Sequence, residues 1–427
     1  MPIFKYLRHP QEFATSLKVG LFLALRDIRR ASFWTTGLII VVMTLTFLNL
    51  VVVSGILVGL IEGATEAVQE RYLGDIFIST LPQRPYIDQT PTLLKSIENL
   101  PGIAAISTRY TTSGKLEANW KVSRPPSNLP EEVGTTIAGI DPIAEDQVGG
   151  LSERIIEGEY LTADDYNEVM LGAMLLDRYL GFDSVSFPSL KNVQIGDKIR
   201  VTIGETAHEV RVKGILRSKV DEIDRRVFFN AAQLRGIIGR YDYNADEIAV
   251  KLQDGFDPLE VKRAMLARGV DKYAKVQTAE EGEPKFIKDL KQTFALLGNA
   301  IGSIGLVVAS ITIFIVIFVN AITRRRQIGI MKGIGVTGTA IEFSYILQSL
   351  FYAVSGMLLG SVVVFFVLKP YFTSYPINFP FSDGILVATV SGTAIRGGVL
   401  FIATMIAGFI PARIVVKQNT LDAILGR

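Results

Sequence analysis

The sequence predicts a membrane α-helical protein with four transmembrane helices and a large extracytoplasmic α+β domain inserted between the first two helices. Three observations favour this fold class. Hydrophobic residues make up 49% of the 427 residues and charged residues only 20%, which is unusually apolar for a soluble protein. Four stretches are long and apolar enough to cross a bilayer. One long polar stretch, 62–291, separates the first of them from the second.

Each predicted span contains the roughly 20 apolar residues that a bilayer crossing requires. The first is free of charge from Trp34 to Leu60. The fourth is the least uniform, because Arg396 lies near its outer end, where we expect the side chain to reach the headgroup region. The predicted transmembrane ranges are 34–61, 292–322, 341–368 and 389–412.

Lysine and arginine gather on one side of these spans, which predicts the orientation in the membrane. We expect the amphipathic N-terminal segment 1–33, the link 323–340 and the tail 413–427 to be cytoplasmic, so that both termini lie inside the cell. The domain 62–291 and the loop 369–388, whose one basic residue is Lys369, then lie outside. The basic residues on the cytoplasmic side are Lys5, Arg8, Lys18, Arg26, Arg29, Arg30, Arg324, Arg325, Arg326, Lys332, Arg413, Lys417 and Arg427.

The outward domain contains two strand–helix–strand patterns, at 75–112 and 246–278, next to the flanking spans. They predict a split α+β subdomain. A proline-rich break at 123–130 opens a different segment, and 197–216 alternates apolar and polar residues as a hairpin does. We therefore expect a β-rich subdomain inserted at about 123–240. The helical pattern at 284–297 is expected to continue into the second span as one long helix.

Three glycine pairs spaced four residues apart predict close helix packing within the spans. Small residues at this spacing let helix backbones approach each other where lipid offers no hydrophobic driving force. The pairs are Gly55 and Gly59, Gly298 and Gly302, and Gly356 and Gly360.

Composition and motifs exclude several classes of chemistry. The net charge of +2 does not favour nucleic acid as a partner, and the absence of cysteine removes disulfides and thiolate metal sites. His208-Glu209 begins like a zinc-protease motif, but Val212 stands where the second histidine is required. Neither a G-x-x-x-x-G-K-[ST] phosphate loop nor a G-x-S-x-G elbow is present. We expect no catalytic residue, metal or cofactor in this chain.

The segment after the second span, TRRRQIGIMKGIGV at 323–336, has two interpretations. Its arginines would lie at the lipid headgroups, and its isoleucines and Met331 would form an apolar strip that docks in a groove of a soluble partner. Alternatively, it is a plain basic loop that obeys the positive-inside rule. Spacing alone does not decide between them. The expected strip consists of Ile328, Ile330, Met331 and Ile334.

The order of segments resembles that of the MacB, LolC/LolE and FtsX-like permeases of ABC transporters over essentially the whole chain. The most specific local match is the 323–336 segment, where Gln327 stands at a position that the family usually gives to an acid. LALRDIRRAS at 23–32 is similar to the family's segment before the first span. PARIVVKQNTLDAIL at 411–425 resembles its C-terminal ending, with Thr420 where proline is usual. VMLGAMLLDRYLG and VQIGDKIRV resemble its outward core domain.

This resemblance implies a non-catalytic permease subunit. Two copies, or one copy and a paralogue, would join two ABC ATPase subunits that carry ATP and Mg²⁺, and a periplasmic adaptor is a further partner to consider. ATPase closure would push a coupling helix, and the outward domains would then move. This movement would export or release a hydrophobic substrate or a lipoprotein. The membrane lipid around the spans is a further expected partner. The ATPase-coupling residues implied are Arg324, Arg325, Arg326, Gln327, Ile328, Gly329, Ile330, Met331, Lys332, Gly333, Ile334 and Gly335.

Two alternatives remain open from the sequence. The protein could be an FtsX-like regulator of an extracellular cell-wall hydrolase, although its outward domain is larger than expected for that group. It could also be a membrane receptor or adhesion protein that needs no ATPase, in which case any basic loop could replace 324–334.

Overall fold

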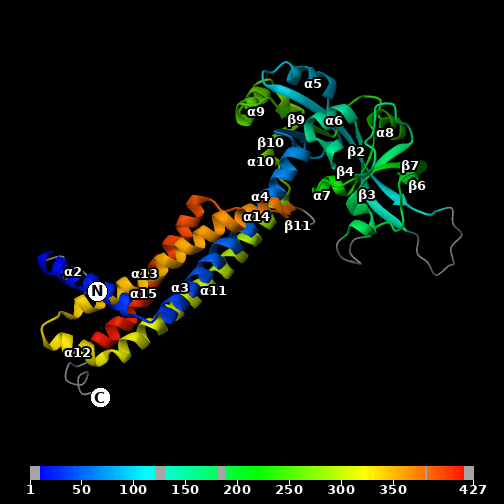
Figure 1. Ribbon diagram of the computed structural model, residues 1–427. Coiled ribbons are helices and arrows are strands. Elements are labelled where there is room, and N and C mark those ends of the chain that lie inside the picture. Colours follow the sequence, from blue (N-terminus) through cyan, green and yellow to red (C-terminus); the bar gives the residue numbers. More distant parts are fainter. Residues whose placement is uncertain (1–9, 121–130, 181–187, 380–381, 418–427) are drawn as a thin grey trace. The chain divides into compact units, whose positions relative to one another are not determined.

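The computed structural model describes residues 10–120, 131–180, 188–379 and 382–417. It divides into two compact units (Figure 1). We call the first the membrane unit; it comprises Met1–Leu60, Lys291–Ile377 and Gly384–Arg427. The second, the sheet domain, comprises Ile61–Leu290 and Asn378–Asp383. The divisions at 60/61 and 290/291 fall beside the expected limits of the outward domain.

Four helices in the described part of the chain are long and apolar enough to cross a membrane, as the sequence predicts. Their bounds are Phe33–Leu73, Lys285–Thr323, Gly338–Ser374 and Val390–Val416. The first contains α3 (Phe33–Leu48) and α4 (Ser54–Val68), which alternate with π-helical segments at Asn49–Val53 and Gln69–Leu73. The second is α11, a single helix that joins the 284–297 pattern to the span. The third contains α13 (Gly338–Val363), a π-helical segment and α14 (Lys369–Ser374), and the fourth is α15.

The first helix continues beyond Ile61, where the apolar run ends. Hydropathy marks only the part that suits hydrocarbon, whereas helical hydrogen bonding continues through the polar residues that follow. Gly74 ends the helix with a positive φ of 66°. A Cβ at this position would lie 2.7 Å from the Val250 carbonyl oxygen, so glycine also permits the close approach of the next strand.

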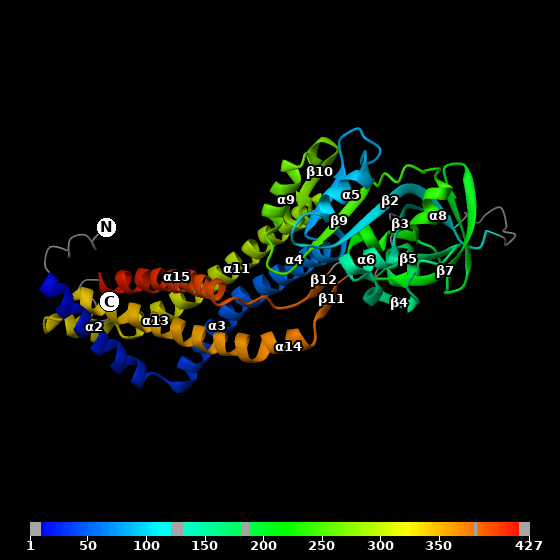
Figure 2. The same cartoon turned by 90° about the horizontal axis from the view of Figure 1, so that it is seen from above.

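Helix α13 is the centre of the membrane unit. It packs against α2 (Pro10–Arg30), α3 and α15 (Figures 1 and 2). The core between these helices and α11 contains fully buried side chains such as Met43, Phe47 and Ile313. Large apolar side chains elsewhere on the helices are exposed, as expected for surfaces that face lipid.

The glycine pairs make contacts of different closeness. A Cβ on Gly356 would lie 2.5 Å from Met43 Cβ, and one on Gly360 would overlap Phe47, so this pair lies at the tight crossing of α13 and α3. Gly55 and Gly59 face the extended segment 385–387 that precedes α15, rather than a helix. Gly298 and Gly302 face side chains at 3.5 Å, which is ordinary packing distance.

One half of the sheet domain contains both predicted strand–helix–strand units. The first is β1 (Ile76–Thr80), α5 (Thr90–Glu98) and β2 (Ile103–Glu117). The second is β9 (Glu247–Leu252), α9 (Pro258–Ala267) and β10 (Ala274–Thr278). Their strands pair antiparallel in the order β10-β1-β9-β2, which is the split, ferredoxin-like arrangement.

The other half is a closed ring of strands. Around the ring, β2 pairs with β3, β3 with β8, β8 with β5, β5 with β7, β7 with β6, and β6 with β2 again. The ring strands from β3 to β8 lie within the range expected for the insertion, but the ring also uses the long β2, which belongs to both halves, with its first residues on β9 and its last on β6. The new ring strands are β3 (Glu132–Ile140), β5 (Glu168–Gly172), β6 (Lys198–Ile203), β7 (Thr206–Leu216) and β8 (Arg226–Asn230).

The remaining elements of the sheet domain are short. His208 lies on β7, which confirms the strand expected there. They include α6 (Pro142–Gly149), β4 (Ile155–Gly158), α7 (Asp221–Asp224), α8 (Ala231–Ile237) and α10 (Ala279–Gly282).

Candidate functional site

The link between the second and third spans folds as a short helix between two turns. Helix α11 ends at Thr323, and α12 (Arg325–Gly333) starts after Arg324. Gly335 has a φ of 100°, which lets the chain reverse before α13. The hydroxyl of Thr337 caps α13 by accepting a hydrogen bond from the Ala340 amide.

Asp27 of α2 holds the start of this link. Its Oδ1 lies 2.8 Å from Arg324 Nη1, and its Oδ2 accepts a hydrogen bond of 3.3 Å from Gln348 of α13. At the other end of α12, Lys332 Nζ donates a 3.0 Å hydrogen bond to the carbonyl of Val416 on α15. The link is thus fixed directly to α2 and α15, and through Asp27 to α13. Asp27 was not among the expected site residues, although it is the lone acid in LALRDIRRAS.

The expected apolar strip is divided between two faces of α12, so its interpretation as one strip is wrong. Ile328 is only 2% exposed and packs in the core of the membrane unit, and Met331 also packs against this core. Ile330 and Ile334 are 48% and 77% exposed and, four residues apart, share the other face. The reason is helical geometry: positions 328 and 330 point in nearly opposite directions. Of the other implied residues, Arg326, Gln327, Gly333 and Gly335 are exposed, Arg324, Arg325 and Lys332 are half-buried, and Gly329 is buried.

A cavity of 240 Å³ lies beside the Asp27–Arg324 pair, between α2, α12 and α13. Its lining combines basic side chains, such as Arg26 and Arg30, with the apolar Ile330. This end of the membrane unit therefore presents two exposed apolar side chains, Ile330 on α12 and Ile334 at its C-cap, next to a basic recess.

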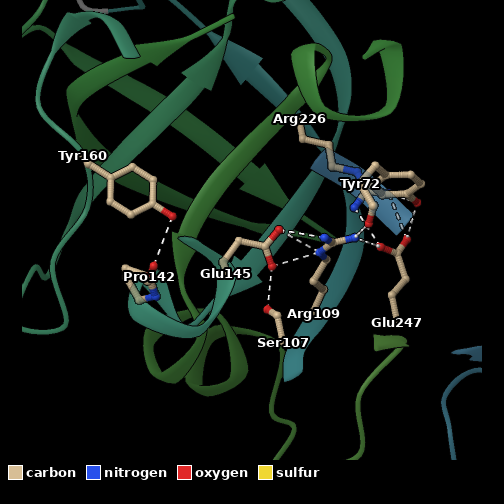
Figure 3. Close-up of polar contacts among 8 residues, drawn as sticks. All are labelled: Tyr72, Ser107, Arg109, Pro142, Glu145, Tyr160, Arg226 and Glu247. Atoms are coloured by element: carbon tan, nitrogen blue, oxygen red, sulfur yellow. Dashed lines mark hydrogen bonds and ion pairs between the residues drawn. The ribbon is translucent and has the colours of Figure 1, made fainter. Parts of the chain in front are cut away.

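A second polar cluster lies inside the sheet domain, at the end of the first long helix (Figure 3). Arg109 on β2 is 1% exposed and pairs with Glu145 of α6, also 1% exposed, at 2.7 Å. Its Nη1 donates a 2.7 Å hydrogen bond to the Tyr72 carbonyl and lies 3.6 Å from a Glu247 carboxylate oxygen. Arg226 on β8 donates to Glu247 at 2.8 Å. We call these five residues the buried network.

The ring of Tyr72 lies near both guanidinium groups of the buried network. Each guanidinium carbon is 5.0 Å from the ring centroid, which allows cation–π attraction to both arginines. The Tyr72 hydroxyl accepts a hydrogen bond from Arg226 and donates one to Glu247. Burial, together with Glu247, raises the pKa of Tyr72 above its ordinary value. Burial opposes the charge of Glu247, but Arg226 and Arg109 outweigh it and lower the pKa of that carboxyl.

The ends of the first and second long helices are also tied together within the sheet domain. Gln69 Nε2 donates a 2.9 Å hydrogen bond to the buried Glu283, just before α11 begins. Arg71 donates to the carbonyl of Ser218. Ile287 of α11 packs in the same apolar cluster as Ala64 of α4. No short sequence motif predicts these contacts, because the residues that make them come from segments far apart in the chain.

Two protein-family models match the chain. The MacB-like periplasmic core domain matches residues 36–268, which is more than half of the chain. The FtsX-like permease C-terminal model matches residues 299–420.

The chain belongs to the MacB- and FtsX-like family of ABC transporter permeases. It is therefore a permease with several membrane spans, and its sheet domain corresponds to the family's periplasmic core.

Among known relatives of this permease is the macrolide export ATP-binding/permease protein MacB of Agrobacterium fabrum, which is 26% identical over 193 residues. That match covers 42% of this chain and 28% of the relative. An uncharacterized ABC transporter permease of Methanocaldococcus jannaschii is 24% identical over 246 residues, covering 55% of this chain and 59% of the relative. The permease thus spans less than two thirds of either relative.

Two solved structures are similar to part of the permease. The periplasmic region of MacB from Actinobacillus actinomycetemcomitans has a TM-score of 0.35 and 14% identity, and the match covers 48% of this chain and 88% of that one. The extracellular domain of YknZ from Gram-positive bacteria has a TM-score of 0.32 and 13% identity, with 48% and 99% covered.

Proposed function

We propose that this permease couples ATP hydrolysis by separate ABC ATPase subunits to a conformational change of its sheet domain outside the cell membrane. The chain itself is non-catalytic, and ATP and Mg²⁺ bind the partner. Both termini and α12 are cytoplasmic, in accordance with the positive-inside rule. Two permease chains and two ATPases form the working unit.

The observation that carries this proposal is the construction of the link. Ile330 and Ile334 are exposed although they are large and apolar, and such residues on a short helix suit docking into a groove of a soluble partner. The contacts of Arg324 and Lys332 with neighbouring helices hold α12 firmly, so that a push on its exposed face moves the helices behind it. A plain basic loop requires neither feature.

The long helices supply the path to the sheet domain. The first continues without interruption from Phe33 to Leu73, and α11 from Lys285 to Thr323, so each belongs to both units. The end of the first helix is fixed by the buried network, and Gln69 ties it to the start of the second. We propose that displacement of either helix is passed to β2 and β9 through these contacts.

The substrate class is the one that the family resemblance implies, and the character of the spans agrees with it. They are almost free of charge, and a polar conduit through a bilayer needs charged or polar lining. We therefore propose a hydrophobic substrate or a lipoprotein that is handled at the outer leaflet or beyond.

The test is capture of the ATPase by the tagged permease in detergent, followed by mass spectrometry of the bound proteins. Wild-type permease is expected to retain an ABC ATPase, and Ile330→Asp/Ile334→Asp is expected to lose it. Ile328 is left unchanged because an aspartate at that buried position would disturb the fold. The matched control is Ile143→Asp/Leu259→Asp, since these residues are 63% and 49% exposed on the sheet domain.

The control variant should retain the ATPase in full. Equal loss in both variants would point to general damage and count against α12 as the docking element. If wild-type permease retains no ATPase under conditions that preserve a known relative's complex, the coupling proposal fails and the ATPase-independent receptor becomes the leading hypothesis.

A further inference from the structure

An apolar groove lies between α3, α13 and α15 in the membrane unit. It has a volume of 430 Å³, and its lining includes Phe47, Met357, Phe365 and Phe401. Gly398 leaves one side open, because a Cβ there would meet nothing within 4 Å. The volume lies within the range of about 300–1,000 Å³ that is typical of small-molecule sites. Its apolar lining suits a hydrocarbon chain.

Two hydroxyl groups interrupt this apolar lining, from Thr393 on α15 and Ser361 on α13. Thr393 is only 6% exposed, and its Oγ1 is buried without a hydrogen-bond partner among the residues that the structure describes. A buried hydroxyl without a partner is energetically unfavourable, and a ligand oxygen that accepts a hydrogen bond from it would relieve this cost.

A cation stands next to the groove on the same helix. The Arg396 side chain extends towards the N-terminus of α15, and its Nη1 lies 3.1 Å from where a Cβ on Gly392 would stand. Among the side chains that the structure describes, no carboxylate pairs with Arg396. An arginine inside a span is costly unless a counter-charge or water meets it.

We propose that this groove binds one anionic phospholipid of the bilayer. Because the Arg396 side chain reaches back to the level of Gly392, its guanidinium, Thr393 and Gly398 follow one another along α15 in the order that a phospholipid requires. The Arg396 guanidinium would pair with the phosphate, Thr393 would donate to an ester oxygen, and an acyl chain would lie past Gly398 towards Phe401. By the predicted orientation, this end of α15 belongs to the outer leaflet.

Charge complementarity favours a phospholipid over the other occupants of such a groove. A transported hydrophobic substrate or a second copy of the chain would cover the apolar lining. Neither of them necessarily carries an anion for Arg396 and a hydrogen-bond acceptor for Thr393. A bilayer phospholipid supplies both together with its acyl chain. Binding of this lipid does not depend on an ATPase, so it can be tested separately from the proposed coupling.

The experiment is native mass spectrometry of the full chain in detergent, titrated with phosphatidylglycerol or with phosphatidylcholine of the same acyl chains. Wild-type protein is expected to bind one phosphatidylglycerol in preference to phosphatidylcholine. Arg396→Gln should reduce that preference about tenfold, which is the effect of losing one charge-assisted hydrogen bond. Gly398→Leu should weaken the binding of both lipids, because the new side chain starts from a Cβ that meets nothing within 4 Å and occupies part of the groove.

Two matched variants decide the outcome. Gly37→Leu makes the same change at another glycine of the membrane unit whose Cβ would meet nothing within 4 Å, and it should leave binding unchanged. Arg413→Gln removes a cation from the opposite end of α15 and should preserve the preference. Unchanged binding in Gly398→Leu would overturn the proposal, and so would equal losses in Arg413→Gln and Arg396→Gln. If Gly398→Leu dissociates a dimer, the occupant of the groove is a second copy of the chain. If the protein retains an adduct that is not a phospholipid, the occupant is that molecule. Either result would overturn the proposal.

Discussion

The sheet domain and the membrane unit join their elements in opposite ways. In the sheet domain, charged side chains are buried completely, and Arg109 and Glu145 are each 1% exposed between β2 and α6. In the membrane unit, α13 and α3 meet through the bare backbone of Gly356 and Gly360. The difference follows from the surroundings. A domain in water gains from burying apolar surface and can hold a complete polar network inside it, whereas helices in lipid depend on close van der Waals packing.

The two tryptophans of the chain allow each unit to be followed separately. Trp34 lies in the membrane unit and Trp120 in the sheet domain. Trp34→Phe leaves Trp120 as the fluorescence reporter of the sheet domain, and Trp120→Phe leaves Trp34 for the membrane unit. Unfolding of the full chain in detergent can then be assigned to one unit or the other.

The largest effect is expected from Arg109→Met, which leaves the carboxylates of Glu145 and Glu247 buried without their shared partner. Removing one member of a buried ion pair typically costs about 3–5 kcal/mol. The free energy of unfolding reported by Trp120 should fall by this amount. Lys115→Met is the matched control on the same strand, because the pair of Lys115 with Glu132 is 64% and 47% exposed. If both variants unfold alike, the buried network has no special role in stability.

Acid should destabilise the sheet domain through the same network, reversibly and less severely. Since the folded state lowers the pKa of Glu247, the carboxylate contributes stability above its unfolded pKa of about 4.3. That contribution is lost as the pH falls through the lower folded value. We expect the Trp120 transition to weaken below about pH 4.3 and to recover on neutralisation.

Glu247→Gln tests whether this group causes the acid dependence. The variant should be less stable at pH 7, because Arg226 and Arg109 lose a charged partner. Its stability should also fall less steeply in acid than that of the wild type. Identical slopes would assign the acid dependence to other carboxylates.

At the tight crossing of α13 and α3, Gly356→Ala should destabilise the membrane unit by about 1–3 kcal/mol, as overpacking does. The new Cβ would lie 3.0 Å from backbone atoms of Met43 and Thr44, which cannot rotate away. Gly298→Ala is the matched control, since its Cβ would meet Leu57 at an ordinary 3.5 Å and alanine favours helix. The Trp34 transition measures both, and equal effects would contradict the distinction between the two glycine pairs.

The comparison of units also shows what sequence could predict. The four spans follow from charge-free apolar runs, and the two strand–helix–strand units follow from local alternation, because each signal lies within one short segment. The ring closure through β2 depends on which strands meet, and hydropathy does not encode pairing.

In the candidate site, the position of the link followed from its motif, but its orientation did not. The inward face of Ile328 and the outward face of Ile330 depend on how α12 is fixed to its neighbours. The buried network was missed because Tyr72, Arg109 and Glu247 look like ordinary polar residues of separate elements. Only the folded chain brings these three together.

The smallest effect on stability is expected at Asp27, whose pair with Arg324 is 23% and 32% exposed and lies at the end of the spans. Partly exposed pairs are typically worth about 1 kcal/mol or less, so Asp27→Asn should barely move the Trp34 transition. Arg324→Gln and the double variant complete a cycle that isolates the pair. Because the pair positions α12 rather than stabilising the unit, ATPase capture should fall more than stability does. A large stability loss with full capture would make the pair structural, like the buried network of the sheet domain.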